Sequence, residues 1–273
     1  VEGTPDYASS VVAWNGQTPL PELTASYFSE SLTSNDNVHA YENSQFISYL
    51  VNRRHLSFKG MWDTVAFNSL YGDNGFLAFQ NYVSGATGKT FDQVWTDFVD
   101  YALFDPSQPM VQVESTGFKL TDAAAQGSRA VVVPSFAARL ILVESEPPSG
   151  QQTRSIKLST SGLASGTSVE IWQVQNRDRT NGQLKSVLVA GQATSSTFNL
   201  GTSDDLFAVV LNTGTAERSI TITANTDASV VGSCSDDGTY TRFCRNISSY
   251  RLNYDTIAEL QSECLAVTFN NEK

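Results

Sequence analysis

Apolar residues recur at helical spacing through residues 1 to about 105 of the chain. The clearest pattern follows Thr90, where apolar residues fall three and four positions apart until Pro106. These residues are Phe91, Val94, Trp95, Phe98, Val99, Ala102 and Leu103. Thr90 and Gln93 have the spacing of a capping box, in which each side chain binds the backbone N–H of the other residue. The pattern therefore predicts a helix that begins after Thr90 and ends before Pro106.

Three further amphipathic helices are expected upstream of that one. The first runs from Tyr41 to about Arg54 and buries an apolar stripe. Its buried residues are expected to be Phe46, Ile47, Leu50 and Val51. The second lies around Trp62 to Leu70, and the third around Phe76 to Val83. This part of the chain is thus predicted to be helical.

Beyond the segment Asp105-Pro106-Ser107-Gln108-Pro109 the pattern changes to short β-branched runs. Gly, Ser, Asn and Pro separate these runs, as at Asn181-Gly182. The runs are Val111–Val113, Ala130–Val133, Arg139–Val143, Ile156–Leu158, Val169–Val174, Val187–Ala190, Leu206–Leu211 and Ile220–Thr223. Many short strands with turn residues between them indicate an antiparallel β-sandwich. We place it at residues 110–232, after a helical part at 1–105 and before a polar tail at 233–273 with one short helical stretch near 255–264.

The tail carries all three cysteines and a glycosylation sequon. Cys234 and Cys244 are predicted to form a disulfide in an oxidising compartment. Cys264 is then left over, either as a free thiol or bonded to another chain. Asn246, followed by Ile247 and Ser248, is the predicted N-glycosylation site. Together these features favour a secreted glycoprotein.

Charge excludes two classes of partner. Lys and Arg total 17 against 28 Asp and Glu, so the net charge is -11. Nucleic-acid binders and anionic-membrane binders need clustered basic residues, and we expect neither partner. No apolar run reaches the roughly 18–20 residues of a membrane span. The start has no basic and apolar leader, so any signal peptide is expected to have been removed or to lie outside this piece.

Several catalytic patterns are missing from the sequence. No G-x-S-x-G elbow exists, and Val83 stands where a phosphate loop ending at Thr90 needs its first glycine. The only histidines are His39 and His55, and there is no H-E-x-x-H. This chain alone therefore cannot build a conventional catalytic zinc site.

The first residues nevertheless carry a motif. The sequence Glu2-Gly3-Thr4-Pro5-Asp6-Tyr7 resembles the E-G-x-x-x-Y glutamate helix of gluzincin zinc metallopeptidases. The resemblance implies that Glu2 is the third ligand of a zinc ion whose two histidine ligands lie outside this chain. A solvated N-terminal acid is the alternative for Glu2.

Two downstream segments extend the resemblance over about residues 1–105. The sequence from Tyr41 to Leu50 is similar to the Y-E-x-(G/S)-x-x-F-x-x-Y-L helix of aminopeptidase-type gluzincins. In that helix the tyrosine donates to the oxyanion, which implies a catalytic role for Tyr41; a helix-start aromatic without chemistry is the alternative. The sequence from Gly88 to Phe98 is similar to the family's G-K-S/T-F-x-x-x-W-x-x-F segment.

The expected fold is therefore α+β and multidomain. It comprises the helical C-terminal half of a gluzincin-like peptidase domain, followed by an antiparallel β-sandwich. The expected function is that of the C-terminal portion of a secreted zinc metallopeptidase that hydrolyses peptide bonds. Its partners would be a peptide or protein substrate and an N-terminal companion segment that carries H-E-x-x-H. The alternative is a non-enzymatic extracellular protein, structural, adhesive or self-assembling, on a peptidase-like scaffold.

Overall fold

The structure of the protein is a computed structural model, in which the described residues are 23, 27–34, 37–70, 75–106, 117–121, 125–145, 153–192, 194–226, 233–236 and 242–245. At 37–41, 68–70, 233–236 and 242–245 only the backbone is described. The expected strand at 111–113 and the expected helix near 255–264 lie outside these ranges.

Within the described ranges, the α-helices that precede the strands are α2 (Asn37–Asn52), α3 (Phe58–Leu70), α4 (Gly75–Thr87) and α5 (Phe91–Phe104), with a short 3-10 helix η2 at Tyr27–Ser29. The capping box predicted at the start of α5 is confirmed. The Gln93 backbone N–H donates to Thr90 Oγ1 at 3.3 Å, and the Thr90 N–H donates to Gln93 Oε1 at 3.0 Å. Every apolar residue predicted to be buried along α5 is buried.

Two β-sheets follow the helices. The five-stranded sheet has the order β1-β3-β8-β5-β6, and the four-stranded sheet has the order β2-β9-β4-β7. Their strands are β1 (Phe118–Leu120), β2 (Gln126–Val133), β3 (Ala137–Ser145), β4 (Thr153–Ser161), β5 (Thr167–Val174), β6 (Gly182–Val189), β7 (Ser195–Gly201), β8 (Asp205–Asn212) and β9 (Arg218–Thr226). All neighbouring pairs in these sheets are antiparallel except β1 and β3, which are parallel. A separate antiparallel hairpin joins β10 (Ser233–Asp236) to β11 (Arg242–Arg245).

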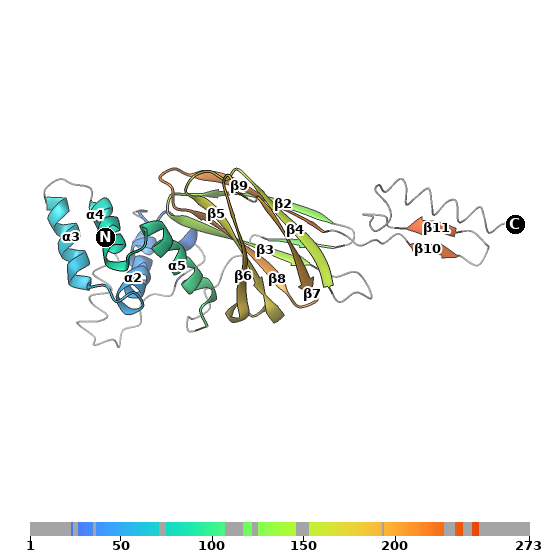
Figure 1. Cartoon of the computed structure of the whole chain (residues 1–273), viewed down its shortest axis with the longest axis horizontal. Coiled ribbons are helices and arrows are strands. Elements are labelled where there is room, and N and C mark those ends of the chain that lie inside the picture. Colours follow the sequence, from blue (N-terminus) through green and yellow to red (C-terminus); the bar gives the residue numbers. More distant parts are fainter. Residues whose placement is uncertain are drawn as a thin grey trace.

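The central strand β8 is buried along its whole length. Successive side chains of a strand point to opposite faces. Leu206, Ala208 and Val210 belong to the apolar cluster between the two sheets. Phe207, Val209 and Leu211 belong to a second cluster, which they share with α2, α4 and α5. The helical part therefore packs on the outer face of the five-stranded sheet, with α5 beside the sheet and α3 and α4 farther from it in Figure 1.

The expected fold, a helical peptidase half followed by an antiparallel sandwich, is wrong. Strands make up more of the described regular structure than helices do, and they form two packed sheets. The helices are a covering layer whose apolar cluster continues into sheet residues such as Ala138 and Leu140. The parallel pair of β1 and β3 also departs from a purely antiparallel sandwich. The physical reason is that β3 and β8 contribute apolar residues to both faces of the sheet, so the sheet is stable only when helices cover its outer side.

Candidate functional site

The structure describes only some of the predicted site residues. Glu2 and Asn246 lie outside the described residues. Tyr41 lies near the start of α2, where the backbone alone is described. Cys234 and Cys244 are directly opposite each other in the hairpin of β10 and β11. Opposed residues of an antiparallel pair have Cα atoms about 4.5–5.5 Å apart, a separation that a disulfide can bridge.

Within the described ranges, no group of three or more His, Cys, Asp or Glu side chains could hold a metal ion. These residues therefore do not fit a zinc site by themselves. The predicted ligand Glu2 is not among them, so the zinc prediction gains nothing from this part of the chain.

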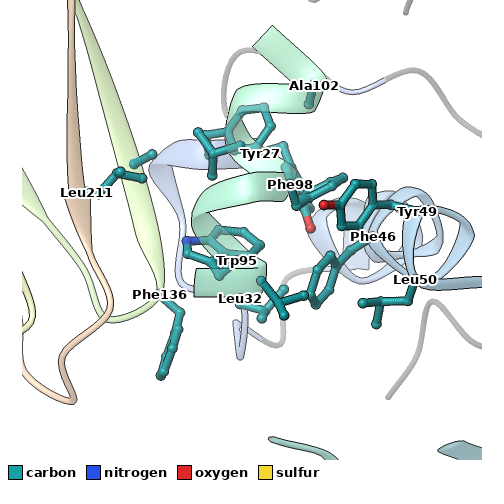
Figure 2. Packing of buried hydrophobic residues seen from close by; sticks show 14 of the residues in the cluster. Tyr27, Leu32, Phe46, Tyr49, Leu50, Trp95, Phe98, Ala102, Phe136 and Leu211 are labelled. Carbon is teal, nitrogen blue, oxygen red and sulfur yellow. The ribbon is translucent and has the colours of Figure 1, made fainter. Parts of the chain in front are cut away.

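The two helices that carry the downstream motifs contact each other through the motif residues. The ring of Phe46 in α2 lies 4.9 Å from that of Phe98 and 5.5 Å from that of Trp95, both in α5. Tyr49 lies 5.3 Å from Phe98. Figure 2 shows these rings between α2 and α5, with Leu211 of β8 on the sheet side of the same cluster. The apolar motif positions are therefore packing residues that fix α2 against α5.

Hydrogen bonds hold the first half of α2 as well. The hydroxyl of Tyr27, a fully buried residue, donates to Asn43 Oδ1 at 2.9 Å, and Asn43 Nδ2 donates to the Leu32 carbonyl at 3.4 Å. Burial, and secondarily the charge of Glu42, raises the pKa of Tyr27 well above its ordinary value. Tyr27 therefore stays a neutral donor. The motif residue Glu42 is only 3% exposed, so it too is enclosed by protein.

A cleft of about 410 Å³ opens where the end of α2, the side of α5 and strand β5 meet, and we name it the α5–β5 cleft. Its aromatic walls include Tyr101, Phe104 and Trp172. The rings of Phe104 and Trp172 are stacked, with centroids 4.2 Å apart and an angle of 12° between their planes. Since Phe104 ends α5 and Trp172 lies in β5, this stack joins the helical layer to the sheet.

Ion pairs surround the rim of the cleft. The Arg54 guanidinium binds the carboxylate of Asp97 and also donates from Nε to the Tyr49 hydroxyl at 2.7 Å. Lys89 Nζ reaches the same carboxylate at 2.7 Å. Arg53 lies over the Tyr101 ring, 4.9 Å from its centroid. These pairs are partly solvated and contribute little stability each, but they orient the rim.

Asp100 of α5 lines this cleft, and Glu170 of β5 lies close enough to influence the Asp100 carboxyl group. Glu170 is 5% exposed, and its Oε2 accepts from Trp172 Nε1 at 3.3 Å. Asp100 Oδ1 is buried and receives no hydrogen bond from any described group. Burial, followed by the charge and hydrogen bond of Glu170, raises the pKa of Asp100 to about 9. The Asp100 carboxyl therefore retains its proton at neutral pH, mainly because burial disfavours its charged form.

Sequence reasoning missed this pair for a reason that lies in the fold. Glu170 lies between Val169 and Ile171, and this alternation of apolar and polar residues predicts that Glu170 faces solvent on a sandwich strand. The helical layer covers that face, and only the packing of α5 on β5 brings Asp100 next to Glu170, since the two residues are far apart in the sequence. The available signal was the single acid within the run Val169–Val174, combined with an acid between buried positions of α5.

A second cleft of about 470 Å³ lies between the start of α5 and the loops that precede β5 and follow β8. Lys89, Asp97 and Thr213 are among its lining residues. Asp97 lines both clefts, and its carboxylate is already engaged by two cations.

The chain matches no family model and no curated protein. Among solved structures it is similar to Aeromonas hydrophila PliG, a periplasmic inhibitor of g-type lysozyme, with a TM-score of 0.32, 5% identity and coverage of 41% of this chain and 95% of that chain. It is also similar to the pre-peptidase C-terminal domain of a Bacillus anthracis collagenase, with a TM-score of 0.31, 9% identity and the same two coverages. The Yersinia pseudotuberculosis-derived mitogen gives a TM-score of 0.28 at 4% identity, covering 39% of this chain and 89% of that one. Likeness at this level carries no argument about function.

Proposed function

We propose that this chain is part of an exported zinc-dependent metallopeptidase that hydrolyses peptide bonds in peptides or proteins. The observation that carries the proposal is the contact between the two downstream motif segments. Phe46 and Tyr49 of the first segment pack on Trp95 and Phe98 of the second, although the two segments are far apart in the sequence. Segments that resemble parts of one catalytic unit are thus neighbours in space.

The catalytic roles follow from the resemblance. Glu2 would be one zinc ligand, and the two histidine ligands with the general base would come from an N-terminal companion segment. When bound, zinc would activate a water molecule for attack on the peptide carbonyl. Tyr41 would donate its phenolic hydrogen to the oxyanion that forms. The packing of α2 on α5 and the bond between Tyr27 and Asn43 would hold the backbone of Tyr41 in place.

Export is the second part of the proposal. It is supported by the paired positions of Cys234 and Cys244 and by the sequon at Asn246. No helix among the described residues is long and apolar enough to cross a membrane. The sandwich would position the enzyme or contact extracellular protein.

The experiment measures zinc content and peptide hydrolysis in the whole natural protein, after its intact mass has been determined. Glu2→Gln should abolish both zinc binding and hydrolysis. Glu217→Gln, at an exposed acid between β8 and β9, is the matched control and should change neither. Unchanged zinc content in the Glu2 variant would refute the proposal.

Tyr41→Phe tests the second role in the same protein. It should lower kcat by roughly 10²–10³-fold while zinc content is kept, as expected when one oxyanion donor is lost. Full activity would assign Tyr41 to helix packing alone.

A second function, adhesive or structural, is favoured by the outer face of the four-stranded sheet. One row of hydroxyl residues crosses all four strands: Ser128, Thr223, Ser159 and Ser195 are in register. Ser128 and Thr223 are hydrogen-bonded at 3.1 Å. Such a row of hydroxyls suits uncharged partners, and a zinc-free natural protein that self-associates in sedimentation experiments would support this function over hydrolysis.

A further inference from the structure

The two clefts described above lie along the same side of α5. The second cleft takes Gln93 and Asp97 from this helix, and the α5–β5 cleft takes Asp97 and Phe104. These positions are four and seven residues apart, so they form one stripe of the helix. Strand β5 contributes Ser168 to the second cleft and Trp172 to the α5–β5 cleft, both from the same face of the strand. The two clefts therefore meet at Asp97 and form one groove, which we name the α5 groove.

The α5–β5 cleft is the aromatic end of this groove. Trp172 is partly exposed there, and its orientation is fixed by the stack on Phe104 and by the hydrogen bond from its Nε1 to Glu170. Tyr101 is also partly exposed, with the Arg53 guanidinium 4.9 Å from its ring centroid. An aromatic side chain that is already held in place loses little conformational entropy when a ligand packs against it.

The second cleft is the hydroxyl end of the groove. It is lined by Thr96 of α5, Ser165 of the loop before β5 and Ser168 of β5. None of these three side chains makes a hydrogen bond within the described part of the chain. A hydroxyl group both donates and accepts hydrogen bonds. These side chains are therefore available to ligand groups that also donate and accept.

Ion pairs leave the groove without a dominant sign of charge. The Arg54 guanidinium binds Asp97 where the two clefts meet, and Arg53 lies 3.7 Å from Asp105 at the outer rim. Burial raises the pKa of Asp100 to about 9, so this carboxyl is uncharged at neutral pH. A charged ligand would meet a like charge beside each opposite one. The groove therefore favours an uncharged ligand.

A polypeptide fits this groove poorly. Strand β5 pairs with β8 on one side and with β6 on the other, so the groove contains no free edge of β5 to which a peptide strand could add. The apolar residues that line the second cleft are small or aliphatic: Ala164, Val189 and Ala190. They provide few anchors for peptide side chains. A saccharide, in contrast, combines many hydroxyl groups, no charge and apolar C–H faces that pack on aromatic rings.

We propose that the α5 groove binds a neutral oligosaccharide. The C–H faces of the sugar pack on Trp172 and Tyr101 at the aromatic end. Its hydroxyl groups pair with Thr96, Ser165 and Ser168 at the other end. This binding is separate from peptide hydrolysis and needs no metal ion.

The test is an NMR titration of the isotope-labelled full chain with four neutral probes: cellohexaose, mannohexaose, maltohexaose and N-acetylchitohexaose. At least one probe should shift the backbone amides of α5 and of residues 164–168 while those of β2 and β9 stay in place. Affinity should rise from the disaccharide to the hexasaccharide, because the groove follows α5 for about 20 Å. Hexagalacturonate, an anionic probe of the same length, should bind about tenfold more weakly.

Thr96→Val and Ser168→Ala each remove one hydroxyl from the groove. Each should raise the Kd about three- to tenfold, the usual contribution of one hydrogen bond. Thr197→Val, at an exposed residue of β7 in the other sheet, is the matched control and should leave the Kd unchanged.

Three results would overturn the proposal. They are the absence of amide shifts in α5 with every neutral probe, equal affinity for hexagalacturonate, and a loss of affinity in Thr197→Val as large as that in Thr96→Val. The first two are measured on the wild type, so they decide the matter when a variant does not fold. Zinc content and peptide hydrolysis enter none of these readouts, so failure here leaves the proposed peptidase function untouched.

Discussion

Replacing Phe104 by Ala tests whether the helices and the sheets are one cooperative unit. Phe104 is 6% exposed and ends α5 against the sheet. Its ring stacks on Trp172 and meets Phe207 of β8 edge-on, with centroids 6.2 Å apart. Truncating a buried Phe costs about 3–5 kcal/mol, and this range already includes the cavity that is left. Because stacked aromatic pairs contribute beyond their buried area, we expect the cost for Phe104→Ala to lie near the upper end of this range.

The loss can be followed by two probes during thermal unfolding. At about 2–4 °C per kcal/mol for a domain of this size, the expected decrease in Tm is about 10 °C or more. Circular dichroism at 222 nm reports mainly the helices, and tryptophan fluorescence reports the surroundings of all four tryptophans, among them Trp95 of α5 and Trp172 of β5. Both signals should shift together, because one apolar cluster includes residues of both layers.

The matched control is Phe67→Ala, which makes the same chemical change on α3 at a side chain that is 62% exposed. It should lower Tm by less than a third as much. The reasoning fails if Phe104→Ala leaves Tm within 2 °C of the wild type, or if the helical signal shifts alone while the fluorescence transition stays in place.

Three further predictions concern single residues. Asn212 is fully buried, and its Nδ2 donates to three backbone carbonyls at 2.8–2.9 Å. Asn212→Asp should therefore lower the free energy of unfolding by about 3–5 kcal/mol, measured by denaturant unfolding at pH 7. An effect below about 1 kcal/mol would contradict the described bonds. His55 follows α2 with a φ of 58°, a backbone conformation that glycine adopts more easily than other residues. His55→Gly should therefore raise the free energy of unfolding by about 1 kcal/mol. A decrease in the free energy of unfolding would show that the His55 side chain stabilises the turn. Non-reducing peptide mapping should recover Cys234 linked to Cys244, and a bond from either one to Cys264 would refute that pairing.

The local elements were predictable where a single pattern decided them. The start of α5 depends on Thr90 and Gln93 and on nothing distant, so the sequence predicted it to the residue. Strands β3, β4, β5, β8 and β9 contain the predicted β-branched runs. Strand β7 was missed, because its sequence Ser195–Gly201 is mostly Ser, Thr and Asn, with only Phe198 and Leu200 facing the apolar cluster.

The arrangement of the layers was not predictable in the same way. A strand with apolar residues at every position, such as Leu206–Leu211, reads equally well as a sandwich strand or as one covered on both faces. The α5–β5 cleft depends on that choice, since it exists only where α5 lies on β5. Trp172 of β5 stacks on Phe104 of α5, a contact between layers that the pattern of the strand alone does not indicate. The roles of Glu2 and Tyr41 remain predictions from the motif, because no described side chain tests them.

The double burial of β8 has a consequence for synthesis of the protein. The ribosome completes α5 at Phe104 and reaches the end of β8 at Asn212 roughly 110 residues later, which takes about 5–20 s. During that interval the helices have no sheet on which to bury their apolar side. A nascent chain can form helical turns within microseconds, but the layer cannot close until β8 has paired with β3 and β5. The helical part is thus synthesised well before the sheet on which it packs. Its apolar surface must be shielded from aggregation during that interval.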